Sequence, residues 1–269
     1  MNLSRIYSIF IRQYYLIKGN PVRVVGIFLW IVLDLIQWGF ISKYLSTFGQ
    51  ATFGFINVIL GAIILFEFMS RVQTGIMTTF LEDIWSQNFF NFFASPLKVS
   101  EYLAGMVLSS SALGLIGLGI LIIIAGLGFG YNFFLIGLSL LPFLFILFIF
   151  GIAMGIFVTA MIFRLGPAAE WLGWPIPFIL SIFSGVFYPI STLPAPLQYL
   201  AKILPPAYVF DSLRAIMGTG KFSSTLAFNL IMGGILAIAY LFLMYYFFLR
   251  VYRRNLKSGS IARFSAEQY

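Results

Sequence analysis

The sequence contains no cysteine and no histidine, and only 9% of its 269 residues are charged. The missing residues exclude disulfides, thiol catalysis, haem ligation by histidine and ordinary zinc sites, so we expect no metal site. The scarcity of charge excludes an ordinary soluble domain, in which about a quarter of the residues are charged.

Long apolar runs take the place of the missing charge, and 61% of the residues are hydrophobic. A helix needs about 20 apolar residues to cross the hydrocarbon core of a bilayer. The candidate runs cover about 22–42, 53–79, 102–125, 133–163, 171–188 and 222–249. We therefore predict an all-α polytopic membrane protein with six transmembrane helices.

Three regions follow from this pattern. Residues 1–20 form an amphipathic helix that we expect to lie in the membrane interface, because apolar side chains recur at helical spacing from Leu3 to Ile17. Residues 21–250 form the six-span transmembrane domain, and residues 251–269 form a basic cytoplasmic tail.

The net charge of +8 arises mainly from lysines and arginines near the two ends of the chain. Such juxtamembrane anchors are typical of membrane proteins and do not indicate a nucleic-acid partner. On the predicted topology, eleven Lys and Arg residues lie on the side of the termini and four on the other side. The positive-inside rule therefore predicts that both termini are cytoplasmic.

Polar side chains interrupt the first two predicted spans. Asp34 lies roughly 18 Å into the first span, near the midplane, with Gln37 one turn further on. Glu67, Arg71 and Thr74 follow one face of the second span. Ionisable residues inside a membrane favour a functional role, so we predict that these five line the substrate path or its gate. A structural ion pair between Glu67 and Arg71 explains the pattern equally well.

Residues 82–97, between the second and third spans, carry an aromatic face. Trp85, Asn88 and Phe89 share this face, Glu82 does not, and Pro96 ends the segment. The face is typical of an interfacial aromatic belt or of a helix that docks on a partner protein.

The stretch 184–218 contains five of the eleven prolines, which makes it too broken for a spanning helix. It is also too apolar for an exposed loop, so we predict two re-entrant half-helices in the outer leaflet, between the fifth and sixth spans.

This stretch resembles the C-terminal signature of the permease subunits of ABC-type-2 exporters, over about 35 residues. The residues that carry the resemblance are Gly185, Phe187, Pro189, Leu193, Pro194, Pro205 and Arg214. One departure is Leu204, which stands where the family commonly has asparagine before the later proline.

The resemblance implies the permease subunit of an ATP-driven exporter in the cytoplasmic (inner) membrane of a prokaryote. Its implied partners are membrane lipids, an ATP-binding-cassette ATPase and a second permease copy, in a homodimer or a related heterodimer. Residues 82–97 would form the cytoplasmic coupling helix that docks on the ATPase. The implied substrate is amphipathic: a drug, a lipid or a lipid-linked glycan.

The sequence itself contains no nucleotide-binding loop, because Phe222 stands where a P-loop needs serine or threonine after Lys221. We therefore expect no enzyme activity and no cofactor in this chain, with ATP and Mg bound by the partner subunit. The alternative is an ion-gradient-driven secondary transporter or channel, for which Asp34 is the one midplane carboxylate.

Overall fold

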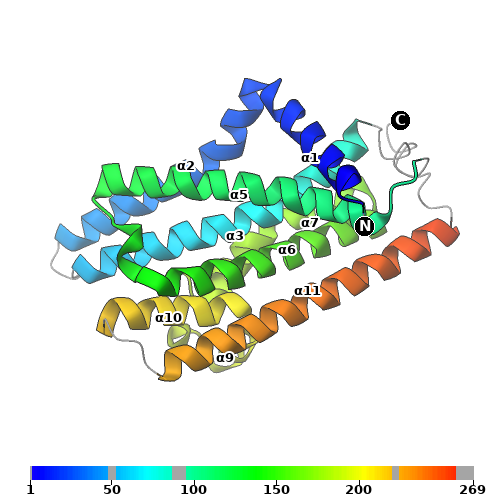
Figure 1. Ribbon diagram of the computed structural model, residues 1–269. Helices are drawn as coiled ribbons and strands as arrows, with labels where there is room; N and C mark the ends of the chain where they lie inside the picture. The colour runs from blue at the N-terminus through cyan, green and yellow to red at the C-terminus, as the bar shows by residue number, and fades with distance from the viewer. Residues whose placement is uncertain (1, 48–52, 87–94, 220–223, 259–269) are drawn as a thin grey trace.

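The computed structural model describes residues 2–47, 53–86, 95–219 and 224–258, which form a bundle of helices running side by side (Figure 1). These ranges contain no strand. Five of their helices are long and apolar enough to cross a membrane: Pro21–Leu45, Asn57–Trp85, Val99–Phe129, Gly137–Leu165 and Leu226–Ser258. The prediction of an all-α, multi-pass membrane protein is therefore confirmed.

Helix α3 (Phe53–Trp85) forms the centre of the bundle and packs against α5 (Val99–Phe129) and α6 (Leu140–Leu165). Polar residues of α3 such as Gln73 and Thr74 are buried there, because polar side chains of membrane helices usually face the interior of the bundle. Glycines of α6 allow close approach, since a Cβ on Gly151 would lie 2.8 Å from the carbonyl oxygen of Met69 on α3. Small residues at such contacts are the usual means by which membrane helices pack closely.

The outer helices are α2 (Pro21–Thr47), which packs on α3 and α5, and α11 (Ser224–Ser258), which runs along α6. Ring contacts hold α11 in place: Phe150 meets Tyr240 edge-on, and Phe163 stacks on Phe248. The side-chain amide of Asn255 also donates a hydrogen bond to the carbonyl of Phe163.

Helix α1 (Leu3–Lys18) occupies the region in which the sequence predicts an amphipathic helix. It crosses the end of the bundle at an angle to the other helices (Figure 1). Ile6 and Ile9 are buried, and Ile9 packs on Gly105 of α5, where a Cβ would clash with it. The chain turns at Gly19 and Asn20, and Pro21 begins α2 as a proline at a first helical position can.

The fifth predicted span differs from the others. Residues 171–188 contain the short helices α7 (Glu170–Gly173) and α8 (Pro175–Ser184), and neither is among the five long helices. Together they rise only about 22 Å, less than the ~30 Å core of a bilayer. The local reason is that Pro175 removes a backbone donor between them and that Gly185 ends α8 in a left-handed conformation.

The remaining elements are shorter than the long helices and connect them. The chain includes η1 (Phe133–Ser139), η2 (Pro167–Ala169), η3 (Ile190–Thr192), α9 (Ala195–Lys202) and α10 (Pro205–Thr219). Helix α10 packs against α3, α6 and α11. Because α6 ends and α11 begins at opposite ends of the bundle, the elements from η2 to α10 carry the chain back between them (Figure 1). Five long helices and this broken crossing stand where the sequence predicts six spans.

Candidate functional site

The turn after α8 has a conformation that only glycine accommodates well. Gly185 has φ 66° and ψ 39°, in the left-handed region. A Cβ at this position would lie 2.9 Å from the carbonyl oxygen of Tyr188 and 3.1 Å from a guanidinium nitrogen of Arg214. Both the backbone and the surrounding atoms therefore require glycine.

Arg214 of α10 binds this turn directly. Its Nη1 donates to the carbonyl oxygen of Gly185 at 2.6 Å, and its Nη2 lies 3.0 Å from Oδ1 of Asp211. Phe187 stacks on Trp38 of α2, with ring centroids 4.2 Å apart. The structure therefore brings Gly185, Phe187 and Arg214 together and connects the turn to two helices.

The other residues of the stretch start or support its short helices. Pro189 and Pro194 directly precede η3 and α9, and Pro205 is the first residue of α10. The carbonyl of Leu193 accepts a hydrogen bond of 2.8 Å from Nε2 of Gln198. These residues fix the path of the chain and carry no reactive group.

The helical bundle and this turn can be compared with known families. The family model for ABC-2 type transporters matches residues 4–218, from α1 through α10. The chain belongs to the ABC-2 type transporter family. It is thus the transmembrane permease component of an ABC transporter system, which includes an ATPase partner, and is not itself the catalytic component. A search of curated proteins finds no match.

In this ABC-2 permease, the structure places two of the five predicted path residues, Asp34 and Arg71, within electrostatic range of a third, Glu67. Glu67 on α3 experiences the charges of both Asp34 on α2 and Arg71 on α3. Among the described residues, Glu67 and Arg71 form no direct ion pair. Thr74 is buried with its hydroxyl bonded to the carbonyl of Ser70 at 2.8 Å, and Gln37 is exposed on α2.

The direct ion pair between Glu67 and Arg71, which the sequence offered as a structural explanation, is therefore absent. Their spacing allows such a pair, but their charged groups are not in contact. Nε of Arg71 is buried without a hydrogen-bond partner. The charged group inside the bundle is instead a set of two carboxylates and one guanidinium from α2 and α3.

The sequence reasoning missed a second polar group, at the end of the bundle where α1 lies. Three ion pairs join α1 and the start of α2 to the end of α3 and the start of α5. They are Arg5 with Glu101 at 3.4 Å, Arg12 with Asp83, and Arg23 with Glu82. We call these six residues the ionic cluster. The signal was present, because its acidic and basic members lie on one predicted side of the membrane, but the arginines were interpreted only as anchors.

Buried hydrogen bonds reinforce the ionic cluster. The hydroxyl of Tyr102 donates to Oδ2 of Asp83 at 2.5 Å, and both side chains are buried. Glu101 accepts from the backbone N–H groups of Asn2 at 2.7 Å and Lys98 at 3.1 Å. A carboxylate with this many donors is held in one orientation, so α1 is firmly attached to the start of α5.

The predicted coupling residues lie next to the ionic cluster. Glu82 is paired with Arg23, and the side chain of Trp85, at the end of α3, is 53% exposed. Pro96 is exposed, and its carbonyl accepts a hydrogen bond of 2.5 Å from Arg5. Asn88 and Phe89 lie outside the described residues. Both described ends of the segment are therefore attached to the α1–α2 region.

Proposed function

We propose that this chain is the permease subunit of an ATP-driven exporter in the cytoplasmic (inner) membrane of a prokaryote. Two copies, identical or related, form the transport path, and each binds an ATPase subunit that holds ATP and Mg. The substrate is amphipathic: a drug, a lipid or a lipid-linked glycan. Membership of the ABC-2 family supports this proposal over the ion-gradient-driven secondary transporter or channel that the sequence left as an alternative.

One observation carries the proposal: the most buried helix of the bundle ends in an exposed tryptophan. Helix α3 runs through the core, and its last residue, Trp85, is 53% exposed. Glu82, three residues earlier, is held by Arg23. A rigid helix transmits a displacement of one end along its length, so a push on Trp85 reaches Glu67 and Arg71 inside the bundle.

The orientation follows from the same arrangement. Helix α1 begins and α11 ends at the end of the bundle that carries the ionic cluster (Figure 1). In the proposal this end is cytoplasmic, because the positive charge of the chain is concentrated there. The turn at Gly185 and the short helix α9 then lie toward the outer leaflet.

The test is Trp85→Ala in the full-length permease, co-expressed with its ATPase and purified in detergent. A buried aromatic anchor contributes about 2 kcal/mol or more to an interface, so the affinity for the ATPase should fall at least roughly 30-fold. Substrate-stimulated ATP hydrolysis should fall with it. Trp30→Ala is the matched control, since Trp30 is an exposed tryptophan on α2, within a candidate membrane span.

Two outcomes would contradict the assignment. If Trp85→Ala retains its ATPase and full stimulated hydrolysis, residues 82–97 are only an interfacial anchor. If Trp171→Ala, on α7, instead releases the ATPase, the coupling contact lies in that part of the chain. Trp171 is a suitable comparison because its side chain is exposed at the start of the broken fifth crossing.

A further inference from the structure

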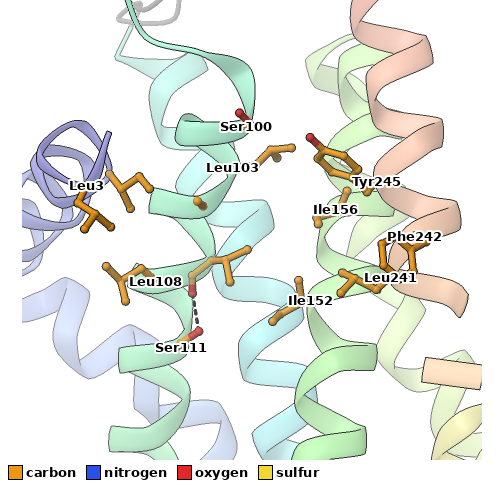
Figure 2. Close-up of a pocket in the computed structure, with 13 residues that line it drawn as sticks. Leu3, Ser100, Leu103, Leu108, Ser111, Ile152, Ile156, Leu241, Phe242 and Tyr245 are labelled. Atoms are coloured by element: carbon orange, nitrogen blue, oxygen red, sulfur yellow. Dashed lines mark hydrogen bonds between the residues drawn. The ribbon is translucent and has the colours of Figure 1, made fainter. Parts of the chain in front are cut away.

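A groove of about 630 Å³ lies between α1, α5, α6 and α11 (Figure 2). Its volume is within the ~300–1,000 Å³ usual for a ligand site. Its walls are mostly aliphatic and aromatic, and they include Leu3, Leu103, Leu108, Ile156 and Phe242. None of its lining residues belongs to the ionic cluster or to the turn at Gly185, so it is a separate site.

The few polar groups of the groove lie at its edges or are already satisfied. Ser100 and Tyr245 lie toward one end of the groove (Figure 2). The hydroxyl of Ser111 donates to the carbonyl of Val107 within the same helix at 2.6 Å. The wall therefore offers apolar contact and few free hydrogen-bonding groups, which suits a hydrocarbon chain.

The length of the groove matches one leaflet of a bilayer. Along α5 it extends from Ser100 to Ser111, a rise of roughly 16 Å. Ser100 is the second residue of the candidate span Val99–Phe129, so the groove begins at one end of this span. Ser111 lies three residues before the middle of this span. The groove therefore reaches about half of the span, and its length is close to the ~15 Å of one leaflet of the hydrocarbon core.

Large apolar side chains of the groove wall are not covered by the protein. Leu3 is 80% exposed and Phe242 is 68% exposed. Phe242 lies in the candidate span Leu226–Ser258, and Leu3 lies in α1, which the sequence predicts to be interfacial. The bilayer is therefore the source of whatever covers them, and a lipid chain has the required polarity and length.

Basic side chains lie near the same end of two of the four helices that wall the groove, α5 and α11. Lys98 directly precedes α5, and Arg253 follows Tyr245 by eight residues on α11. Eleven residues separate Arg253 from Phe242, so the two lie only about 20° apart around the helix. Both cations are exposed, and within the described ranges neither forms an ion pair.

We propose that this groove binds an acyl chain of an anionic phospholipid from the cytoplasmic leaflet, and that Lys98 and Arg253 bind its phosphate headgroup. The bound lipid would cover Leu3 and Phe242 and join α1 to α11, two helices from opposite ends of the sequence. The inference rests on the proposed orientation of the chain. It does not depend on ATP-driven export.

The test uses the full-length protein in nanodiscs of phosphatidylglycerol and phosphatidylcholine in equal amounts, extracted into detergent and analysed by native mass spectrometry. The wild type should retain phosphatidylglycerol in preference to phosphatidylcholine. Arg253→Gln should reduce this preference about fivefold, as expected for one basic residue near an anionic headgroup. The neighbouring Arg254→Gln should leave it unchanged, since Arg254 is exposed on another face of α11.

A second pair of variants tests the apolar wall. Ala104→Trp fills the groove and should reduce retained lipid at least tenfold, whereas Ile123→Trp, at an exposed position of the same helix outside the groove, should not. Monodisperse elution of each variant shows that it is folded. If Ala104→Trp fails to fold, the comparison of Arg253→Gln with Arg254→Gln still tests the proposal.

Each other outcome overturns the proposal in a distinguishable way. Equal retention of the two lipids, unaffected by Arg253→Gln, would mean that only ordinary boundary lipid is present. Loss of phosphatidylglycerol from both tryptophan variants would place the lipid elsewhere. Displacement of the lipid by a transported substrate would make the groove part of the transport path. None of these results bears on whether Trp85 couples the chain to an ATPase.

Discussion

Replacing Arg12 with glutamine should destabilise the end of the bundle that carries the ionic cluster. The side chain of Asp83 is only 1% exposed and that of Arg12 is 26% exposed, so the pair is largely shielded from water. Removing one partner of a buried ion pair leaves an uncompensated charge and costs about 3–5 kcal/mol. At about 2–4 °C per kcal/mol for a chain of this size, the midpoint of thermal unfolding should fall by roughly 6–20 °C.

Two further variants test whether the loss of stability comes from the ion pair between Arg12 and Asp83. Arg12→Gln combined with Asp83→Asn should be more stable than Arg12→Gln alone, because no unpaired charge is left. Tyr102→Phe should cost about 1–3 kcal/mol, since Asp83 loses the donor that lies 2.5 Å from its Oδ2. All variants are compared in one detergent by intrinsic fluorescence during heating.

Arg254→Gln is the matched control, since Arg254 is an exposed arginine that forms no ion pair within the described residues. A surface change of this kind should alter stability by less than about 0.5 kcal/mol. The reasoning is refuted if the effects of Arg12→Gln and Asp83→Asn simply add. Additivity would mean that the two side chains do not interact, and that other contacts hold α1 to the bundle, such as Arg5 with Glu101 and Ile9 with Gly105.

Two further predictions concern the turn and the orientation. Gly185→Ala should lower the unfolding midpoint and impair transport, because alanine costs about 1–2 kcal/mol in the left-handed region and its Cβ would lie 2.9 Å from the carbonyl of Tyr188; wild-type stability would show that the turn relaxes freely. Since the chain has no native cysteine, Tyr199→Cys should react with an impermeant thiol reagent added outside intact cells and Lys257→Cys should not, and the reverse labelling would invert the proposed topology.

The positions of the five long helices could be predicted from the sequence because the causes of helix formation are local. A continuous apolar run such as 230–249 has no other stable state in a membrane than a helix that satisfies its own backbone. The breaks are equally local: Gly19 and Asn20 separate α1 from α2, and Gly185 ends α8. Hydropathy and backbone restriction both act within a few residues, so they can be read along the chain.

The candidate site could be predicted only in part, because contacts between its side chains depend on the tertiary structure. The spacing of Glu67 and Arg71 permits a direct ion pair, but in the folded bundle their charged groups are not in contact. The short fifth crossing was likewise predicted as one span. Proline positions indicate where a helix breaks, but not how far its parts extend before other helices contact them.

The sequence by itself determined the membrane class, the order of the helices and the glycine-dependent turn, because each depends on near neighbours in the chain. Only the tertiary structure decided which polar groups from distant parts of the chain come into contact. Arg12 and Asp83 are far apart in the sequence, as are Gly185 and Arg214, yet each pair is in contact. Opposite charges attract at any separation along the chain, and the packing of α1 and α10 against the bundle selects which of the available partners come within reach.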